Sequence, residues 1–192
     1  MEPSSGRLLD DGRLNAIAPT LLRLASSRVV LLAHQSRPGR VDFTDMSTHC
    51  KRLSEILGRA IRFVPDVGGD EAFEEIGKMS EGDIIFLDNV RGNPEEYGKM
   101  YDSNEETEST ELVTRLSAVS DVYVTDAFAA AHRRSPTLTG FTNSMPCVAG
   151  NLMEGEISSL RIALRNPPKP YLAILGGAKC DDSVRVAQNL IS

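Results

Sequence analysis

Short apolar runs recur along the chain, and stretches with the spacing of an amphipathic helix separate them. The runs predict strands over residues 28–33, 61–64, 83–88, 121–125 and 171–175. An uninterrupted apolar run that follows a helix is typical of a parallel strand buried on both faces. The alternation of strand and helix therefore predicts an α/β fold, a three-layer, doubly wound parallel sheet of the Rossmann-like kind.

Helical spacing supplies the connections between these strands. Leucine and isoleucine at 14, 17, 21 and 24 share one face of a first helix, which Pro19 either starts or kinks. Further helices are predicted over residues 44–57, 69–79, 111–119 and 149–165, and Gly58 is the expected stop of the first of these. His49 is interpreted as a surface or helix-face histidine. Residues 92–111 and 136–146 are predicted to be a solvated loop and a connector.

Composition argues against several classes of protein. The 192 residues are 41% hydrophobic, enough for a sizeable core, and a net charge of -6 argues against a nucleic-acid-binding protein. No apolar run approaches the ~18 residues of a membrane span, and the start does not resemble a signal peptide. Three widely spaced cysteines fit a reducing compartment, so we expect a cytoplasmic protein without a disulfide framework or a metal site.

Chemically useful side chains follow four of the predicted strands. They are His34, Gln35, Ser36 and Arg37 after the first run, Arg91 after the third, His132 and Arg133 after the fourth, and Gly176, Gly177 and Lys179 after the last. Because ligands bind beyond the carboxyl ends of parallel strands, we expect a single ligand edge. Basic groups on an acidic chain point to a small polyanion, and glycines beside a lysine at a helix start suit a phosphate.

Two weaker interpretations stay open on the residues alone. The stretch over residues 121–134 also fits a solvated basic turn. The Gly-Gly-Ala-Lys sequence is a weak signal by itself, since it is neither a Walker A loop nor the dinucleotide fingerprint.

Five motifs in order give the chain a specific resemblance. They are LDDGRL at 9–14, HQSRP at 34–38, LDNVR at 87–91, TDAFAAAHR at 125–133 and LGGAK at 175–179. The chain resembles the phosphoglycerate kinases over nearly its whole length, and is most similar to the N-terminal domain of archaeal members. An unrelated doubly wound phosphosugar enzyme does not account for five ordered motifs.

The resemblance implies a reaction and a set of residues. The family, which acts in glycolysis and gluconeogenesis, moves a phosphoryl group between 1,3-bisphosphoglycerate and Mg-ADP, giving 3-phosphoglycerate and Mg-ATP. Magnesium arrives with the nucleotide, and no side chain identified here is expected to hold it. By motif, the phosphoglycerate would contact Arg13, His34, Gln35, Ser36, Arg37, Arg91, His132 and Arg133, while Gly176, Gly177 and Lys179 would meet the nucleotide phosphates. Arg13 and Lys179 are the expected catalytic residues.

Several departures from the family pattern shape the expected organisation. The family's first strand carries an Arg-x-Asp-x-Asn motif and would precede Met1, and the family's C-terminal nucleotide-binding domain would follow Ser192. We expect neither part among these 192 residues. We expect residues 1–170 to form the phosphoglycerate-binding domain and residues 171–192 to supply a last strand, the Gly-Gly-Ala-Lys loop and a helix toward the missing domain. ATP and ADP would bind only with that domain, so we expect no turnover by these 192 residues alone. The alternative is a stand-alone anion-binding module without turnover.

Overall fold

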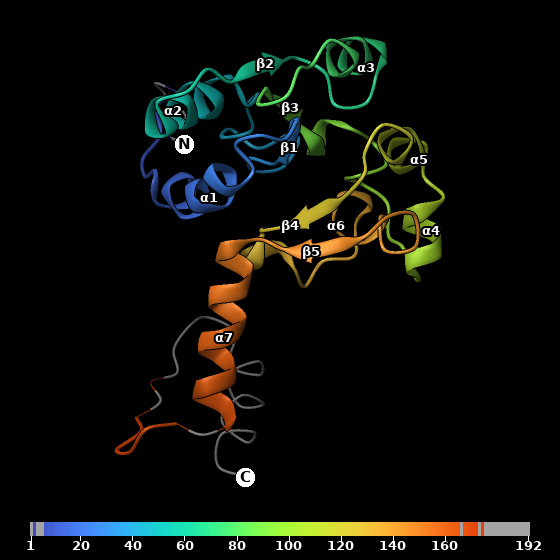
Figure 1. Cartoon of the computed structure of the whole chain (residues 1–192). Helices are drawn as coiled ribbons and strands as arrows, with labels where there is room; N and C mark the ends of the chain where they lie inside the picture. The colour runs from blue at the N-terminus through green and yellow to red at the C-terminus, as the bar shows by residue number, and fades with distance from the viewer. Residues whose placement is uncertain (1, 3–5, 166, 173, 175–192) are drawn as a thin grey trace. The chain divides into compact units, whose positions relative to one another are not determined.

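The computed structural model describes residue 2 and residues 6–165, 167–172 and 174 (Figure 1). The chain divides into two compact units, residues 1–153 and 154–192, and each is described by itself. The predicted domain boundary at residue 170 stays a prediction. Gly176, Gly177 and Lys179 lie outside the described residues.

Strands and helices alternate through the first unit, as the apolar pattern predicts. Their order is α1 (Gly12–Arg23), β1 (Val29–Ala33), α2 (Ser47–Leu57), β2 (Arg62–Val64), α3 (Asp70–Gly77), β3 (Ile84–Asn89), η1 (Val90–Gly92), α4 (Asn104–Glu108), α5 (Glu111–Ser117), β4 (Tyr123–Thr125), η2 (Phe128–Ala130), α6 (Pro136–Thr139), β5 (Cys147–Ala149) and the start of α7 (Asn151–Arg165). α1 runs continuously through Pro19, and Gly58 caps α2 in a left-handed conformation, as expected of a helix stop.

Within the described residues the strands form two parallel sheets, whereas the sequence predicts one. One has the order β1-β3-β2 and the other pairs β4 with β5, and every pairing is parallel. β1 and β4 therefore each have one strand partner among the described residues. The parallel α/β architecture is confirmed, and the division into two sheets is the correction.

Helices cover both faces of the larger sheet. Successive strand residues point to opposite faces, and apolar side chains on both faces are packed against helices. Ile84 and Phe86 of β3 pack with α1 and α2, through Leu21, Cys50 and Leu53 among others. Ile85 and Leu87 of β3 point the other way, into a cluster formed with α3 and α5. The alternation gives the three predicted layers, with β3 buried at the centre.

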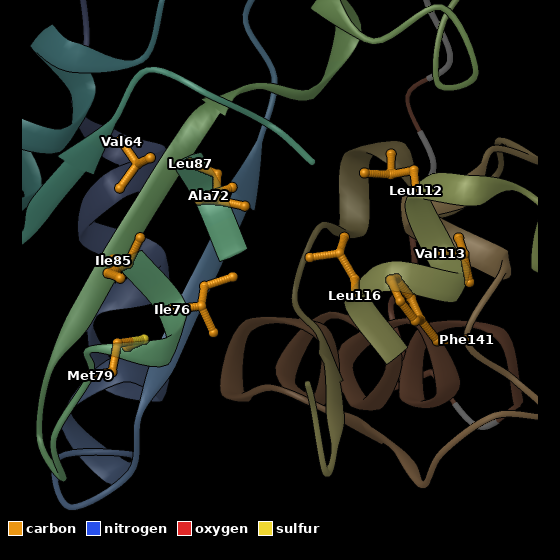
Figure 2. Close-up of a cluster of buried hydrophobic side chains, with 10 residues drawn as sticks. All are labelled: Val64, Ala72, Ile76, Met79, Ile85, Leu87, Leu112, Val113, Leu116 and Phe141. Atoms are coloured by element: carbon orange, nitrogen blue, oxygen red, sulfur yellow. The ribbon is translucent and has the colours of Figure 1, made fainter. Parts of the chain in front are cut away.

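The second of these clusters joins the larger sheet to the segment around β4. Figure 2 shows Val64, Ile85 and Leu87 of the sheet with Ala72, Ile76 and Met79 on one side, and Leu112, Val113, Leu116 and Phe141 on the other. Val30 and Leu32 of β1 and Tyr123 of β4 pack against the same cluster. One apolar core thus holds two sheets that share no ladder of hydrogen bonds.

Four local expectations need correction. β1 is half-buried beyond Val29 rather than buried on both faces, because only one of its edges is paired. α4 interrupts the predicted loop, where Ser103 caps a helix too short for a periodic pattern. β5 follows the predicted connector, at a position where no strand is predicted, because its three residues are all exposed and carry no apolar alternation. His49 lies on α2, as expected of a helix-face histidine, but it is 8% exposed and therefore buried rather than on the surface.

The second unit contains most of α7, whose apolar residues Ile157, Leu160 and Leu164 are exposed. The sequence predicts a last strand over residues 171–175. Tyr171, Leu172 and Ile174 belong to no strand and are exposed, and the other two residues lie outside the described part of the chain. An apolar run becomes a strand only where another strand accepts its hydrogen bonds.

Gly140 is a position where the core admits no side chain. A Cβ there would lie 2.6 Å from Cγ2 of Val113 and 2.7 Å from the carbonyl oxygen of Pro136. Gly140→Ala should therefore destabilise the chain by about 1–3 kcal/mol, measured by urea unfolding. Gly77→Ala is the matched control, because nothing lies within 4 Å of its Cβ position and alanine favours the helix. Equal stabilities for the two variants would contradict the close packing of Gly140.

Candidate functional site

The basic residues that follow β1 and β3 lie at one edge of the larger sheet. β1 and β3 pair in parallel, so their carboxyl ends lie on the same side, where His34 follows Ala33 and Arg91 follows Asn89. Hydrogen bonds between the loop after β1 and the turn after β3 confirm the prediction that these two strand ends meet.

Asn89 connects the two strand ends through its side chain, which is 3% exposed. Its Nδ2 donates to the carbonyl oxygens of Gln35 and Thr44, both at 2.8 Å, and its Oδ1 accepts from the backbone N–H groups of Gln35 and Arg91 at 3.3 Å. A buried amide with four partners holds the loop after β1 against the turn after β3. Asn89 belongs to the LDNVR motif but was not among the predicted site residues; a polar residue that closes an otherwise apolar run was the available signal.

Arg91 is held in place by the loop that follows β1. Its Nη1 donates to the carbonyl oxygen of Ser36, and its guanidinium lies over the ring of Tyr97 with 5.9 Å to the centroid. Ser36 has a left-handed backbone with φ of 58°, and its hydroxyl donates to Asp42 at 2.5 Å. Arg91 therefore keeps part of its donor fork engaged with protein and leaves the rest for a ligand.

Arg133, after β4, reaches the loop after β1. Its Nη1 lies 3.4 Å from Nε2 of His34. A guanidinium has only donors, so this hydrogen bond requires an unprotonated Nε2 on His34. Burial lowers the pKa of His34, and the positive charges of Arg133 and Arg13 lower it further. The ring is therefore neutral at pH 7, in contact with cations.

Asp126 fixes the turn that carries Arg133. Its carboxylate accepts from the hydroxyl of Thr20 on α1 at 2.5 Å and from the backbone N–H of Met153 at 2.9 Å. The hydroxyl of Thr20 also accepts from the N–H of Asn151 at 2.8 Å. The helix that bears Arg13 is thereby tied to the end of β4. Asp126 is a second positioning residue, and it was not among the predicted site residues.

The remaining predicted residues differ in their surroundings. Arg13 and Arg37 are exposed, and neither forms an ion pair within the described ranges. Gln35 contributes its backbone to the bonds with Asn89. His132 is exposed, and its neighbour Arg134 donates instead to the carbonyl oxygens of Tyr101 and Asp102. The structure thus brings His34 and Arg133 into contact, with the charge of Arg13 near enough to lower the pKa of His34, and it places Ser36, Arg37 and Arg91 around one cavity.

A cavity of about 280 Å³ lies beside Arg91 and is lined by Ser36, Arg37, Arg40, Asp42 and Arg91. None of its three arginines forms an ion pair with a described carboxylate. A larger cavity of about 490 Å³ lies against α2, but Arg52 in its wall bonds Asp11 and Glu55. The larger cavity has neutralised walls, so the smaller one is the better anion site.

Within the described residues no group of three or more histidine, cysteine, aspartate or glutamate side chains could hold a metal ion. The same part of the chain contains no helix long and apolar enough to cross a membrane.

Comparison with known proteins relates the chain to one family. The family model for phosphoglycerate kinase matches residues 1–192. The phosphoglycerate kinase of Methanothermus fervidus is 46% identical and that of Methanobacterium bryantii 43% identical, each over 100% of this chain and 47% of the relative. The chain thus spans about half the length of the relatives it matches.

The fold agrees with the same family. The crystal structure of phosphoglycerate kinase from Pyrococcus horikoshii OT3 matches with a TM-score of 0.92 and 37% identity, over 100% of this chain and 47% of that one. The structure of the enzyme from Coxiella burnetii matches with a TM-score of 0.76 and 29% identity. The resemblance inferred from five motifs is therefore confirmed, and the chain belongs to the phosphoglycerate kinase family.

Proposed function

We propose that the edge formed by the ends of β1, β3 and β4 is the phosphoglycerate site of a phosphoglycerate kinase. One observation carries the proposal. Arg13, Arg37, Arg91 and Arg133 lie at or beside that edge on a chain of net charge -6, and no described carboxylate pairs with any of them. Unpaired guanidinium groups on an acidic protein favour a small polyanion.

The ligand has two anionic ends, and the site offers two sets of donors. Arg37 and Arg91 line one cavity, with the loop from His34 to Ser36 beside it. Arg13, His34 and Arg133 form the second set, linked to the first through that loop. A phosphate at one set and a carboxylate at the other would receive the planar, bidentate donors that suit such oxygens. His132, exposed nearby in the chain, would adjoin the site.

The reaction assigned here is the family's transfer of the 1-phosphoryl group of 1,3-bisphosphoglycerate to Mg-ADP, releasing 3-phosphoglycerate and Mg-ATP. Such transfer depends on alignment of the reactants and on neutralisation of charge. In this chain the arginines would orient the C1 carboxyl group, from which the phosphoryl group leaves, with Arg13 nearest the reacting end. Gly176, Gly177 and Lys179 are proposed from the motif alone to meet the transferring and nucleotide phosphates. Magnesium, bound with the nucleotide, supplies charge neutralisation that these side chains do not.

A direct test of the proposal is the binding of 3-phosphoglycerate to the purified chain by calorimetry at low salt. Each charge-assisted contact contributes roughly 1.5–3 kcal/mol, so Arg37→Ala should weaken binding about tenfold or more. Arg28→Ala is the matched control, because Arg28 is equally exposed but precedes β1 at the opposite end of the strand. Equal affinities of the two variants would remove Arg37 from the site, and added salt should weaken binding throughout.

The contact between Arg133 and His34 generates a prediction about protonation. The pKa of His34 lies below 6.5 in the free chain because of burial and two nearby cations. Arg133→Gln removes one cation, so the pKa of His34 should rise. Bound phosphoglycerate brings negative charge and should also raise the pKa of His34. Protonation of His34 should therefore favour binding as the pH falls through the pKa of this residue.

Proton-detected titration of the histidine rings measures both effects. His49 serves as the internal control, because the pKa of His49 is lowered chiefly by its own burial and not by Arg133. If neither Arg133→Gln nor the ligand changes the pKa of His34, the contact between Arg133 and His34 is contradicted.

Turnover is predicted to be absent from these 192 residues alone, which correspond to 47% of the length of the relatives. In-line transfer requires the reacting atoms to be held about 3–3.5 Å apart, and that alignment accounts for roughly 7–11 kcal/mol of the barrier. The purified chain, with Mg-ATP and 3-phosphoglycerate, should therefore show no turnover in a coupled assay, although it should still bind phosphoglycerate. Activity that co-purifies with the chain and disappears in Lys179→Ala would overturn this expectation.

A further inference from the structure

Arg40 was not among the residues that the sequence pattern singled out, yet it lines the cavity beside Arg91. It lies six residues after His34 in a loop between β1 and α2, and it is exposed. Two observations give it a defined place in that cavity. The first is the backbone turn that carries it, and the second is the charge distribution around it.

The turn consists of Arg37, Pro38, Gly39 and Arg40. The backbone N–H of Arg40 donates to the carbonyl oxygen of Arg37 at 3.0 Å, and Gly39 has φ of 82°. Proline at the second position and a glycine with positive φ at the third define a type II turn. Its first and last residues lie within about 7 Å of each other at Cα, so the turn places Arg37 and Arg40 side by side.

The walls of the cavity contain more positive than negative charge. Arg37, Arg40 and Arg91 face a single carboxylate, that of Asp42. Asp42 is already engaged, because it accepts the hydrogen bond from Ser36, and this bond together with nearby Arg40 lowers the pKa of Asp42. Asp42 is not within ion-pair distance of any described arginine. Its carboxylate holds Ser36 in place while the three guanidinium groups retain donors for a ligand.

We propose that Arg40 is a further phosphate-binding residue of this site, aligned with Arg37 by the type II turn so that both act with Arg91 on one phosphate group. The inference rests on the proposed function, because it assumes that the cavity holds the phosphate of phosphoglycerate. It extends that function by making the turn itself a determinant of phosphate affinity. The carboxylate end of the ligand is held elsewhere and should not sense Arg40.

The test compares three probes by calorimetry at low salt: 3-phosphoglycerate, inorganic phosphate and glycerate, which lacks the phosphate. Arg40→Gln should weaken binding of the two phosphate-bearing probes about tenfold and leave glycerate unchanged, as expected for one charge-assisted contact. Arg40→Lys keeps the charge without the planar fork and should fall between. Arg28→Gln, which removes an equally exposed arginine from the other end of β1, should match wild type.

A second pair of variants tests the turn without changing any charge. Gly39→Ala forces an alanine into a positive-φ position that open space surrounds, so strain and not a clash alters the turn. Phosphate affinity should fall about three- to tenfold, whereas Gly39→Asn, which tolerates that conformation, should stay close to wild type. Unfolding midpoints of all variants show whether the chain remains folded.

The outcomes separate this inference from the proposed function. If Arg37→Gln and Arg91→Gln lose phosphate binding while Arg40→Gln behaves as Arg28→Gln, the site stands and the role of Arg40 is overturned. Equal effects of Gly39→Ala and Gly39→Asn would overturn the role of the turn. If the wild-type chain binds neither phosphoglycerate nor phosphate, the proposed function fails and this inference fails with it.

Discussion

The four hydrogen bonds of the Asn89 side chain are the interaction on which the site depends. They lie where β3 ends, and they fix the backbone of Gln35 and Thr44 at the two ends of the loop after β1. That loop presents His34, Ser36, Arg37 and Arg40, and it also supplies the carbonyl group that anchors Arg91. A buried amide that lost one partner would leave an unsatisfied group, so the network favours a single loop conformation. Arg91 and Arg133 can stay without a carboxylate partner because neutral groups, the carbonyl of Ser36 and the ring of His34, hold them in position.

Much of the fold could be predicted because its signals are long and local. The apolar runs located β1, β2, β3 and β4, and helical spacing located α1, α2, α3, α5 and α7. The strand β5 and the helix α4 were not predicted because β5 is exposed along all three residues and α4 consists of five polar residues, so neither has an apolar pattern. The buried state of His49 escaped because it depends on what packs over α2, which no local pattern records. The division into two sheets was not predicted for the same reason, because it depends on pairing between segments that are distant in the sequence.

The site shows the same division between local and distant information. Which basic residues follow which strands was readable from the chain, because polar residues directly after apolar runs stand out. Their partners were not readable. The contact of Arg133 with His34 joins residues 99 positions apart, and that of Thr20 with Asp126 joins residues 106 positions apart. Arg133 and Arg134 are neighbours in the sequence, but the structure directs Arg134 to the carbonyl groups of Tyr101 and Asp102.

The division into two sheets also bears on solubility. Among the described residues β1 and β4 each present one edge without a strand partner. Natural proteins protect such edges with lysine, proline or a bulge, because an unprotected edge is a template for intermolecular pairing. The sequence of β1, Val-Val-Leu-Leu-Ala, contains none of these residues and combines high β-propensity with no charge. Its register with β3 is irregular near Ala33, so only its carboxyl-terminal end is distorted. β1 therefore has the sequence features of an aggregation-prone segment.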